Sequence, residues 1–176
     1  MESALLQNLM TGTGSGTEFI GGLVIVILYA TIGLLGAAGS IFIFRRMFQG
    51  GWELIFWASF LIVIAAFYLG FSAYFGASSH AWQTEVIGVV IFLACAVVGF
   101  LTRPAIAVGY FLHGTWDLTH SFSGSSLSGL SLTAIPLGYG VFCATFDWTV
   151  GCYLMRREAI WHKPGKFNLY FWRHQI

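Results

Sequence analysis

Apolar residues dominate five long stretches of the chain, and polar residues gather in the short connections between them. The stretches cover residues 19–44, 52–75, 85–101, 104–122 and 132–155. Each approaches or exceeds the roughly 20 residues that an α-helix needs to cross a bilayer. None alternates between apolar and polar positions, as the strands of a membrane barrel do. The pattern predicts an all-α, polytopic membrane bundle of five transmembrane helices.

The composition supports a membrane environment. Hydrophobic residues make up 57% of the chain and charged residues only 9%, with a mean hydropathy of +0.79. So few polar groups could not cover a water-soluble surface. The short connections predict antiparallel neighbours within one transmembrane domain, residues 19–155. We expect residues 1–18 to form a flexible outer tail and residues 156–176 a basic, aromatic cytoplasmic tail.

The basic residues predict the orientation of the bundle. All eight Lys and Arg follow the first, third or fifth apolar stretch, whereas the N-terminal tail and the other two connections carry none. Basic residues concentrate on the cytoplasmic side of membrane proteins. We therefore expect the N-terminus outside and the C-terminus in the cytoplasm. The residues concerned are Arg45, Arg46, Arg103, Arg156, Arg157, Lys163, Lys166 and Arg173.

Two segments are candidates for contact with the membrane surface or with another subunit. Basic and aromatic residues of the C-terminal tail predict a membrane-surface anchor, with a docking surface for a partner subunit as the alternative. The tail is too short to favour nucleic-acid binding. The first helix carries small residues at three- and four-residue spacing, which favours close packing against other helices or another membrane subunit. The predicted anchor residues are Trp161, Lys163, Lys166, Tyr170 and Trp172; the small residues are Gly33, Gly36, Ala37, Gly39 and Ser40.

The candidate chemistry lies in the fourth apolar stretch. His113, Asp117 and His120 follow at spacings of four and three residues. On a helix these positions differ by about 40° and about 60°, so the three side chains share one face. Ionisable groups in hydrocarbon are costly unless they face a partner, a cavity or a metal. This face is therefore a candidate functional site.

The fifth stretch carries a matching polar face. Pro136, Tyr139, Cys143 and Asp147 recur at three- and four-residue spacing. Since neighbouring helices are expected to be antiparallel, Asp147 should approach the depth of His113. Glu85, and His80 in the connection before it, are expected to complete the outer end of this polar region.

The polar residues outside this region have simpler interpretations. Glu53 is expected to stabilise a helix start or to pair with Arg45, Arg46 or Arg103. Trp52, Trp57, Trp82 and Trp161 are expected at the membrane interfaces. The sequence contains no Gly-x-Ser-x-Gly element, phosphate loop or dinucleotide-binding motif.

Two motifs carry a family resemblance. FLHGTWDLTH (residues 111–120) and CATFDWTVGCYL (residues 143–154) resemble the H-G-x-W-D-x-x-H and F-D-x-x-x-G-x-Y-L elements of a small bacterial integral-membrane family of unknown function. Ser121 stands where a second histidine is expected after His120. The resemblance implies a multi-pass protein of the bacterial inner membrane and supplies no reaction. A looser likeness links the His and Asp residues to the alkaline ceramidase superfamily, whose H-x-x-x-H element is absent.

Three interpretations of the polar residues remain open. In the first, His113, Asp117, His120 and Asp147 satisfy one another and fix two helices, in an accessory or scaffolding subunit of a membrane complex. In the second, the same four residues hold zinc or iron in a membrane-embedded hydrolase. In the third, they relay protons or ions. The first is the function that the sequence favours.

Overall fold

The structure, a computed structural model, describes residues 16–48, 51–102, 104–121, 132–133 and 135–161. These residues form helices and connections, with no strand among them. The helices are α2 (Gly16–Met47), α3 (Gly51–Phe75), α4 (Ser79–Gly99), α5 (Pro104–Ser121) and α6 (Leu137–Trp161). The prediction of an all-helical chain is confirmed.

Three helices are long and apolar enough to cross a membrane. They are Phe19–Met47 within α2, Gly51–Phe75 and Ser79–Gly99. Helices α5 and α6 are less apolar because α5 carries the His/Asp motif and α6 carries Asp147 and two arginines. The fold is therefore compatible with a membrane protein.

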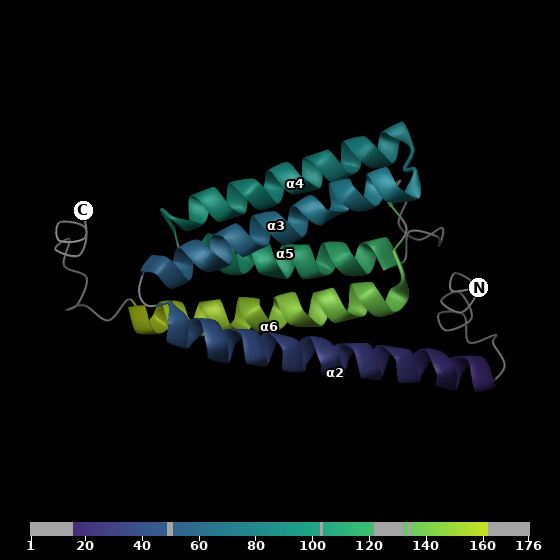
Figure 1. Cartoon of the computed structure of the whole chain (residues 1–176), viewed down its shortest axis with the longest axis horizontal. Helices are drawn as coiled ribbons and strands as arrows, with labels where there is room; N and C mark the ends of the chain where they lie inside the picture. The colour runs from purple at the N-terminus through teal and green to yellow at the C-terminus, as the bar shows by residue number, and fades with distance from the viewer. Residues whose placement is uncertain (1–15, 49–50, 103, 122–131, 134, 162–176) are drawn as a thin grey trace.

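Helix α5 occupies the middle of the bundle. Figure 1 shows α3 and α4 together on one side of α5, and α6 and α2 together on the other. Helix α5 packs against α6, α4 and α3, while α2 packs against α6. The expected contact between the two helices that carry the polar motifs is thus confirmed.

Two helices begin five or six residues away from the predicted positions, at Ser79 and Leu137. Helix α4 starts at Ser79 and not at residue 85, because the Ser78 side chain caps it by accepting a hydrogen bond from the Ala81 amide at 3.2 Å. His80 is therefore in a helix and not in a connection. Helix α6 starts at Leu137 and not at residue 132, directly after Pro136, whose ring nitrogen has no hydrogen to donate.

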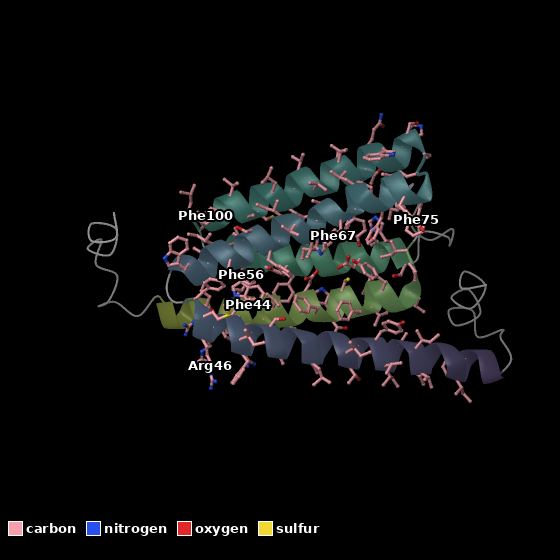
Figure 2. The ribbon with its side chains drawn as sticks, viewed as in Figure 1. Phe44, Arg46, Phe56, Phe67, Phe75 and Phe100 are labelled. Carbon is pink, nitrogen blue, oxygen red and sulfur yellow. The ribbon has the colours of Figure 1, made fainter. Side chains whose placement is uncertain are left out.

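Aromatic side chains fill the end of the bundle near the α2–α3 connection. The rings of Phe44 and Phe56 lie with centroids 4.0 Å apart (Figure 2). Trp57 is 1% exposed, so its side chain packs inside the bundle and does not face outward as that of an interfacial belt residue would. Its backbone carbonyl accepts a hydrogen bond from Tyr110 at 2.8 Å, which joins α3 to α5. Trp52, in contrast, is exposed, as an interfacial residue would be.

Close packing of α2 on α6 depends on Gly33. A Cβ at this position would lie 2.5 Å from the backbone oxygen of Phe142. Ala37, one turn further along α2, is fully buried. Part of the small-residue strip is therefore used inside the bundle. Much of the rest of α2 presents large apolar side chains outward, a surface suited to lipid contact.

Substitution of Gly33 by alanine should loosen this packing. The added methyl group meets a backbone atom that cannot move independently, so we expect a loss of about 1–3 kcal/mol in the free energy of unfolding. Gly39 on the same helix has no atom within 4 Å of its Cβ position and provides the control. Thermal unfolding in one detergent should show a lower midpoint for Gly33→Ala than for the unaltered protein. The midpoint of Gly39→Ala should not be lowered. Equal midpoints would contradict the proposed contact.

Candidate functional site

His113, Asp117 and Asp147 form a buried cluster between α5 and α6. The Nδ1 atom of His113 lies 2.7 Å from Oδ2 of Asp147 and 3.3 Å from Oδ2 of Asp117. One possible metal-ligating atom from each residue lies within 4.8 Å of the others. All three side chains are at most 3% exposed. The structure thus brings three of the four predicted ligands together.

The cluster forms because α5 and α6 approach closely at glycines. A Cβ on Gly114 would lie 3.0 Å from the backbone oxygen of Ala144 and 2.8 Å from the Trp148 ring. A Cβ on Gly140 would lie 2.8 Å from the backbone oxygen of Asp117. Only residues without a side chain permit this separation, which lets the short side chain of Asp147 reach His113.

Tyr68 of α3 also belongs to the cluster. Its hydroxyl donates a hydrogen bond to Oδ1 of Asp117, and its ring lies 5.8 Å from that of His113. The sequence analysis missed this residue. It shares the buried face of α3 with Glu53 and Ser72, and three polar residues on one face of an apolar helix could have revealed it.

A cavity of about 210 Å³ adjoins the cluster. Its polar lining comes from the three cluster residues with Tyr68, Tyr139 and Cys143. The predicted polar face of α6 therefore faces the cavity. The apolar lining comes from α3 and α6: Phe60, Ile64, Phe67, Phe142 and Phe146. Phe67 is 51% exposed, so the lining continues to the outer surface of α3 (Figure 2).

Two atoms of the cluster lack a hydrogen-bond partner. They are Nε2 of His113 and Oδ2 of Asp117, both buried. Buried polar groups are almost always satisfied, because an unsatisfied group costs about 1–3 kcal/mol. The cluster therefore has ligating capacity beyond its internal hydrogen bonds.

His120 lies apart from the cluster. Its Nε2 atom is 2.8 Å from Oε1 of Glu85, and the same carboxylate oxygen accepts a hydrogen bond from the Thr133 amide at 3.1 Å. The ring of His120 packs against that of Tyr68 with 4.3 Å between centroids and a tilt of 40° between the ring planes. Glu85 contributes to this polar region as predicted, but His80 is exposed on α4.

Glu53 pairs differently from the prediction. One of its carboxylate oxygens accepts a hydrogen bond from Tyr153, and the other lies 3.4 Å from Arg157. Both partners are on α6, whereas Arg45, Arg46 or Arg103 was the expected partner. The other expectation, a place at a helix start, agrees with the position of Glu53 in the first turn of α3. The sequence could not reveal this pairing because 100 or more residues separate the partners along the chain.

The predicted membrane anchor lies largely outside the described residues. Trp161 is the last residue of α6, which therefore includes the first part of the predicted tail. Lys163, Lys166, Tyr170 and Trp172 follow the last described residue. Their role as an anchor stays a prediction.

A family model supports the resemblance carried by the two motifs. The family described as "Family of unknown function (DUF6010)" matches residues 41–159, which include α3 to α5 and the site. The chain belongs to this family. No curated protein and no solved structure matches the chain. The likeness to alkaline ceramidases receives no support from these comparisons.

Removal of the Tyr68 hydroxyl should weaken the cluster. In Tyr68→Phe, Asp117 loses a hydrogen bond in a buried site, and we expect about 1 kcal/mol less stability. Tyr74→Phe, at a residue 83% exposed on the same helix, should change the stability by less than about 0.5 kcal/mol. Thermal unfolding in detergent measures both variants. Equal effects would argue against a contribution from the Tyr68 hydrogen bond.

Proposed function

We propose that the protein is an integral-membrane metalloprotein that binds a divalent cation at His113, Asp117 and Asp147 and hydrolyses an apolar, membrane-borne substrate. The observation that carries the proposal is the buried grouping of His113, Asp117 and Asp147, with one ligand atom from each within 4.8 Å of the others, beside a cavity. Three protein ligands with room for a fourth group are typical of catalytic metal sites. Structural metal sites are instead closed by protein ligands.

Charge supports a divalent cation in this site. Two carboxylates beside a single imidazole leave a net negative charge, which is costly inside an apolar bundle. A divalent cation held by Nδ1 of His113 and the two carboxylates would offset this charge and would displace the proton that His113 and Asp147 share in their hydrogen bond. One imidazole with two carboxylates suits zinc, iron or manganese.

The distances are close to those of a ligated ion. Metal–ligand distances of about 2.0–2.1 Å in a tetrahedral site place neighbouring ligand atoms about 3.3 Å apart. The separation of 3.3 Å between His113 and Asp117 matches this value. The separation of 2.7 Å between Nδ1 of His113 and Oδ2 of Asp147 would lengthen by about 0.6 Å on binding.

The surrounding residues suggest how the site would work. A bound cation would supply a Lewis acid and lower the pKa of a water molecule. Tyr68 would hold Asp117 in its ligating orientation through the hydrogen bond that it donates. The apolar lining contributed by α3 and α6 would exclude bulk water and favour an acyl chain over a polar group.

The two other interpretations explain less of this arrangement. A structural role accounts for the contact between His113 and Asp147 but leaves the unpartnered atoms and the cavity unused. An accessory role would require a partner subunit, and no observation identifies one. A proton relay could run from Asp117 through Tyr68 towards His120 and Glu85. One carboxylate oxygen of Glu85 accepts hydrogen bonds, and the other is buried without a partner. However, Tyr68 meets His120 through its ring and directs its hydroxyl to Asp117.

We also propose that all five helices cross the membrane, with the N-terminus outside. Three helices meet the length and hydropathy that a span requires. Helices α5 and α6 pack alongside them (Figure 1). The side chains of His113, Asp117, His120 and Asp147 are buried within the bundle. Arg45, Arg46 and Arg156 lie together at one end of the bundle, as the positive-inside rule expects.

Metal content and hydrolysis provide the test of the function. Protein incubated with zinc, iron or manganese and then desalted should retain one ion per chain, measured by elemental analysis. It should also cleave a fluorogenic long-chain acyl ester in micelles, and a chelator should abolish this cleavage. Asp147→Asn and His113→Ala should lose both the ion and the activity, because each removes a ligand. His80→Ala, at an exposed histidine, should retain both.

Retention of the ion in the ligand variants would contradict the metal site. Binding without hydrolysis of acyl esters or amides would contradict the enzyme. Proton uptake into protein-containing vesicles that resists chelation and stops in Asp147→Asn would favour the relay instead.

The proposed topology makes a separate prediction. Because five crossings place the two termini on opposite sides, a protease added outside intact cells should remove an N-terminal epitope tag and leave a C-terminal one. A variant in which all eight Lys and Arg residues are replaced by glutamine should lose this preference, since basic residues set the orientation. Accessibility of both tags from the same side would exclude an odd number of spans.

A further inference from the structure

A second hollow lies between α2 and α6, at the end of the bundle where both helices carry arginines. It has a volume of about 640 Å³. One part is lined by the apolar residues Ala38, Ile41 and Phe42 of α2. The other part is lined by Arg45, Arg46 and Arg156. The hollow, called the arginine groove below, shares no lining residue with the cavity beside His113.

The positive charge of the groove is not balanced by a carboxylate in its own lining. Among the described residues, the lining holds three arginines and neither Asp nor Glu. Tyr153 also lines the groove, and its hydroxyl donates a hydrogen bond to Glu53. Glu53 in turn is paired with Arg157 at 3.4 Å. The three groove arginines therefore remain available to an external anion.

The groove arginines are accessible as well as charged. Arg45, Arg46 and Arg156 are all exposed. The guanidinium carbon of Arg46 lies 4.1 Å from the centre of the Phe42 ring, which orients this side chain beside the apolar part of the groove. Figure 2 shows Arg46 extending from the end of α2 beyond the ribbon.

This combination fits one class of ligand. Guanidinium groups bind phosphate oxygens through paired hydrogen bonds, and basic hollows between membrane helices suit anionic headgroups. The adjoining apolar strip would accept a hydrocarbon chain. A free phosphate ester would use only the charged part, whereas a phospholipid would use both parts.

We propose that the arginine groove is a binding site for an anionic phospholipid, with the headgroup phosphate on Arg45, Arg46 and Arg156 and an acyl chain along Ala38, Ile41 and Phe42. The proposal does not depend on the metal site, since the two hollows are lined by different residues. It assigns these arginines a ligand in addition to their effect on topology.

A structural role for the arginines is the competing explanation. Cations near helix C-termini stabilise the partial negative charge there, and Arg45 and Arg46 lie in the last turn of α2. This effect would account for α2 by itself. It does not account for the contribution of Arg156 from another helix to the same hollow, or for the apolar strip that continues from it.

Native mass spectrometry of the full chain tests the proposal. The protein is placed in nanodiscs of equal parts phosphatidylglycerol and phosphatidylcholine, and the lipids retained after release are counted. We expect at least one phosphatidylglycerol to be retained in preference to phosphatidylcholine. Each arginine changed to glutamine should weaken retention about fivefold, and the triple variant about 100-fold (about 1 kcal/mol for each). The corresponding lysine variants should lose less, because they keep the charge and lose only the paired hydrogen bonds.

A bulky residue in the apolar strip distinguishes lipid binding in the groove from general attraction of anionic lipid to the charged surface. Ala38→Trp keeps every charge and fills the strip, so phosphatidylglycerol retention should fall about tenfold, as loss of the buried part of an acyl chain would cause. Ala66→Trp, on the exposed face of α3, is the matched control and should have no effect. Unfolding midpoints in lipid-free detergent should show that all variants fold.

Three outcomes would overturn the proposal. Equal retention of both lipids by the unaltered protein would remove the preference for an anionic headgroup. Unchanged retention in Ala38→Trp would show attraction to the charged surface alone. Displacement of the lipid by millimolar glycerol phosphate would show a site for a soluble phosphate ester instead.

Discussion

Burial of ionisable groups in an apolar bundle is the constraint on which the rest of the structure depends. Such groups must be satisfied by one another, because neither lipid nor an apolar core can solvate them. The chain meets this demand through three sets of contacts: Glu53 with Tyr153 and Arg157, His113 with its two aspartates, and Glu85 with His120. Each set joins residues of different helices. The same contacts that lower the cost of burial therefore also fix which helices are neighbours.

Close helix packing makes these contacts possible. Aspartate has a short side chain, so Asp147 reaches His113 only because glycines allow α5 and α6 to approach. Gly33 permits a similar approach of α2 to α6. In lipid, helices associate through van der Waals packing and interhelical hydrogen bonds rather than through exclusion of water. Small residues and polar pairs thus act together, because the small residues allow the short helix separation that the polar contacts require.

The proposed metal site and lipid site follow from what these contacts leave unsatisfied. His113, Asp117 and Asp147 group their possible ligand atoms within 4.8 Å of one another next to a cavity. Arg45, Arg46 and Arg156 have no carboxylate in the lining of their groove, whereas Arg157 has Glu53. Each place has an excess of charge of one sign, which is negative at the His113 cluster and positive at the arginine groove. The complementary ligands are a divalent cation and an anionic headgroup.

Much of the architecture was determined by the sequence itself. Apolar runs gave the five helices, and residue spacing gave the shared face of His113, Asp117 and His120, since both depend on local geometry. The tertiary structure decided which of these residues meet. It grouped Asp147 with His113 and Asp117, directed His120 to Glu85, added Tyr68 from α3, and paired Glu53 with Arg157 rather than with Arg45 or Arg46. Helical periodicity places side chains around one axis, but the packing of helices far apart in the chain sets the distances between their side chains.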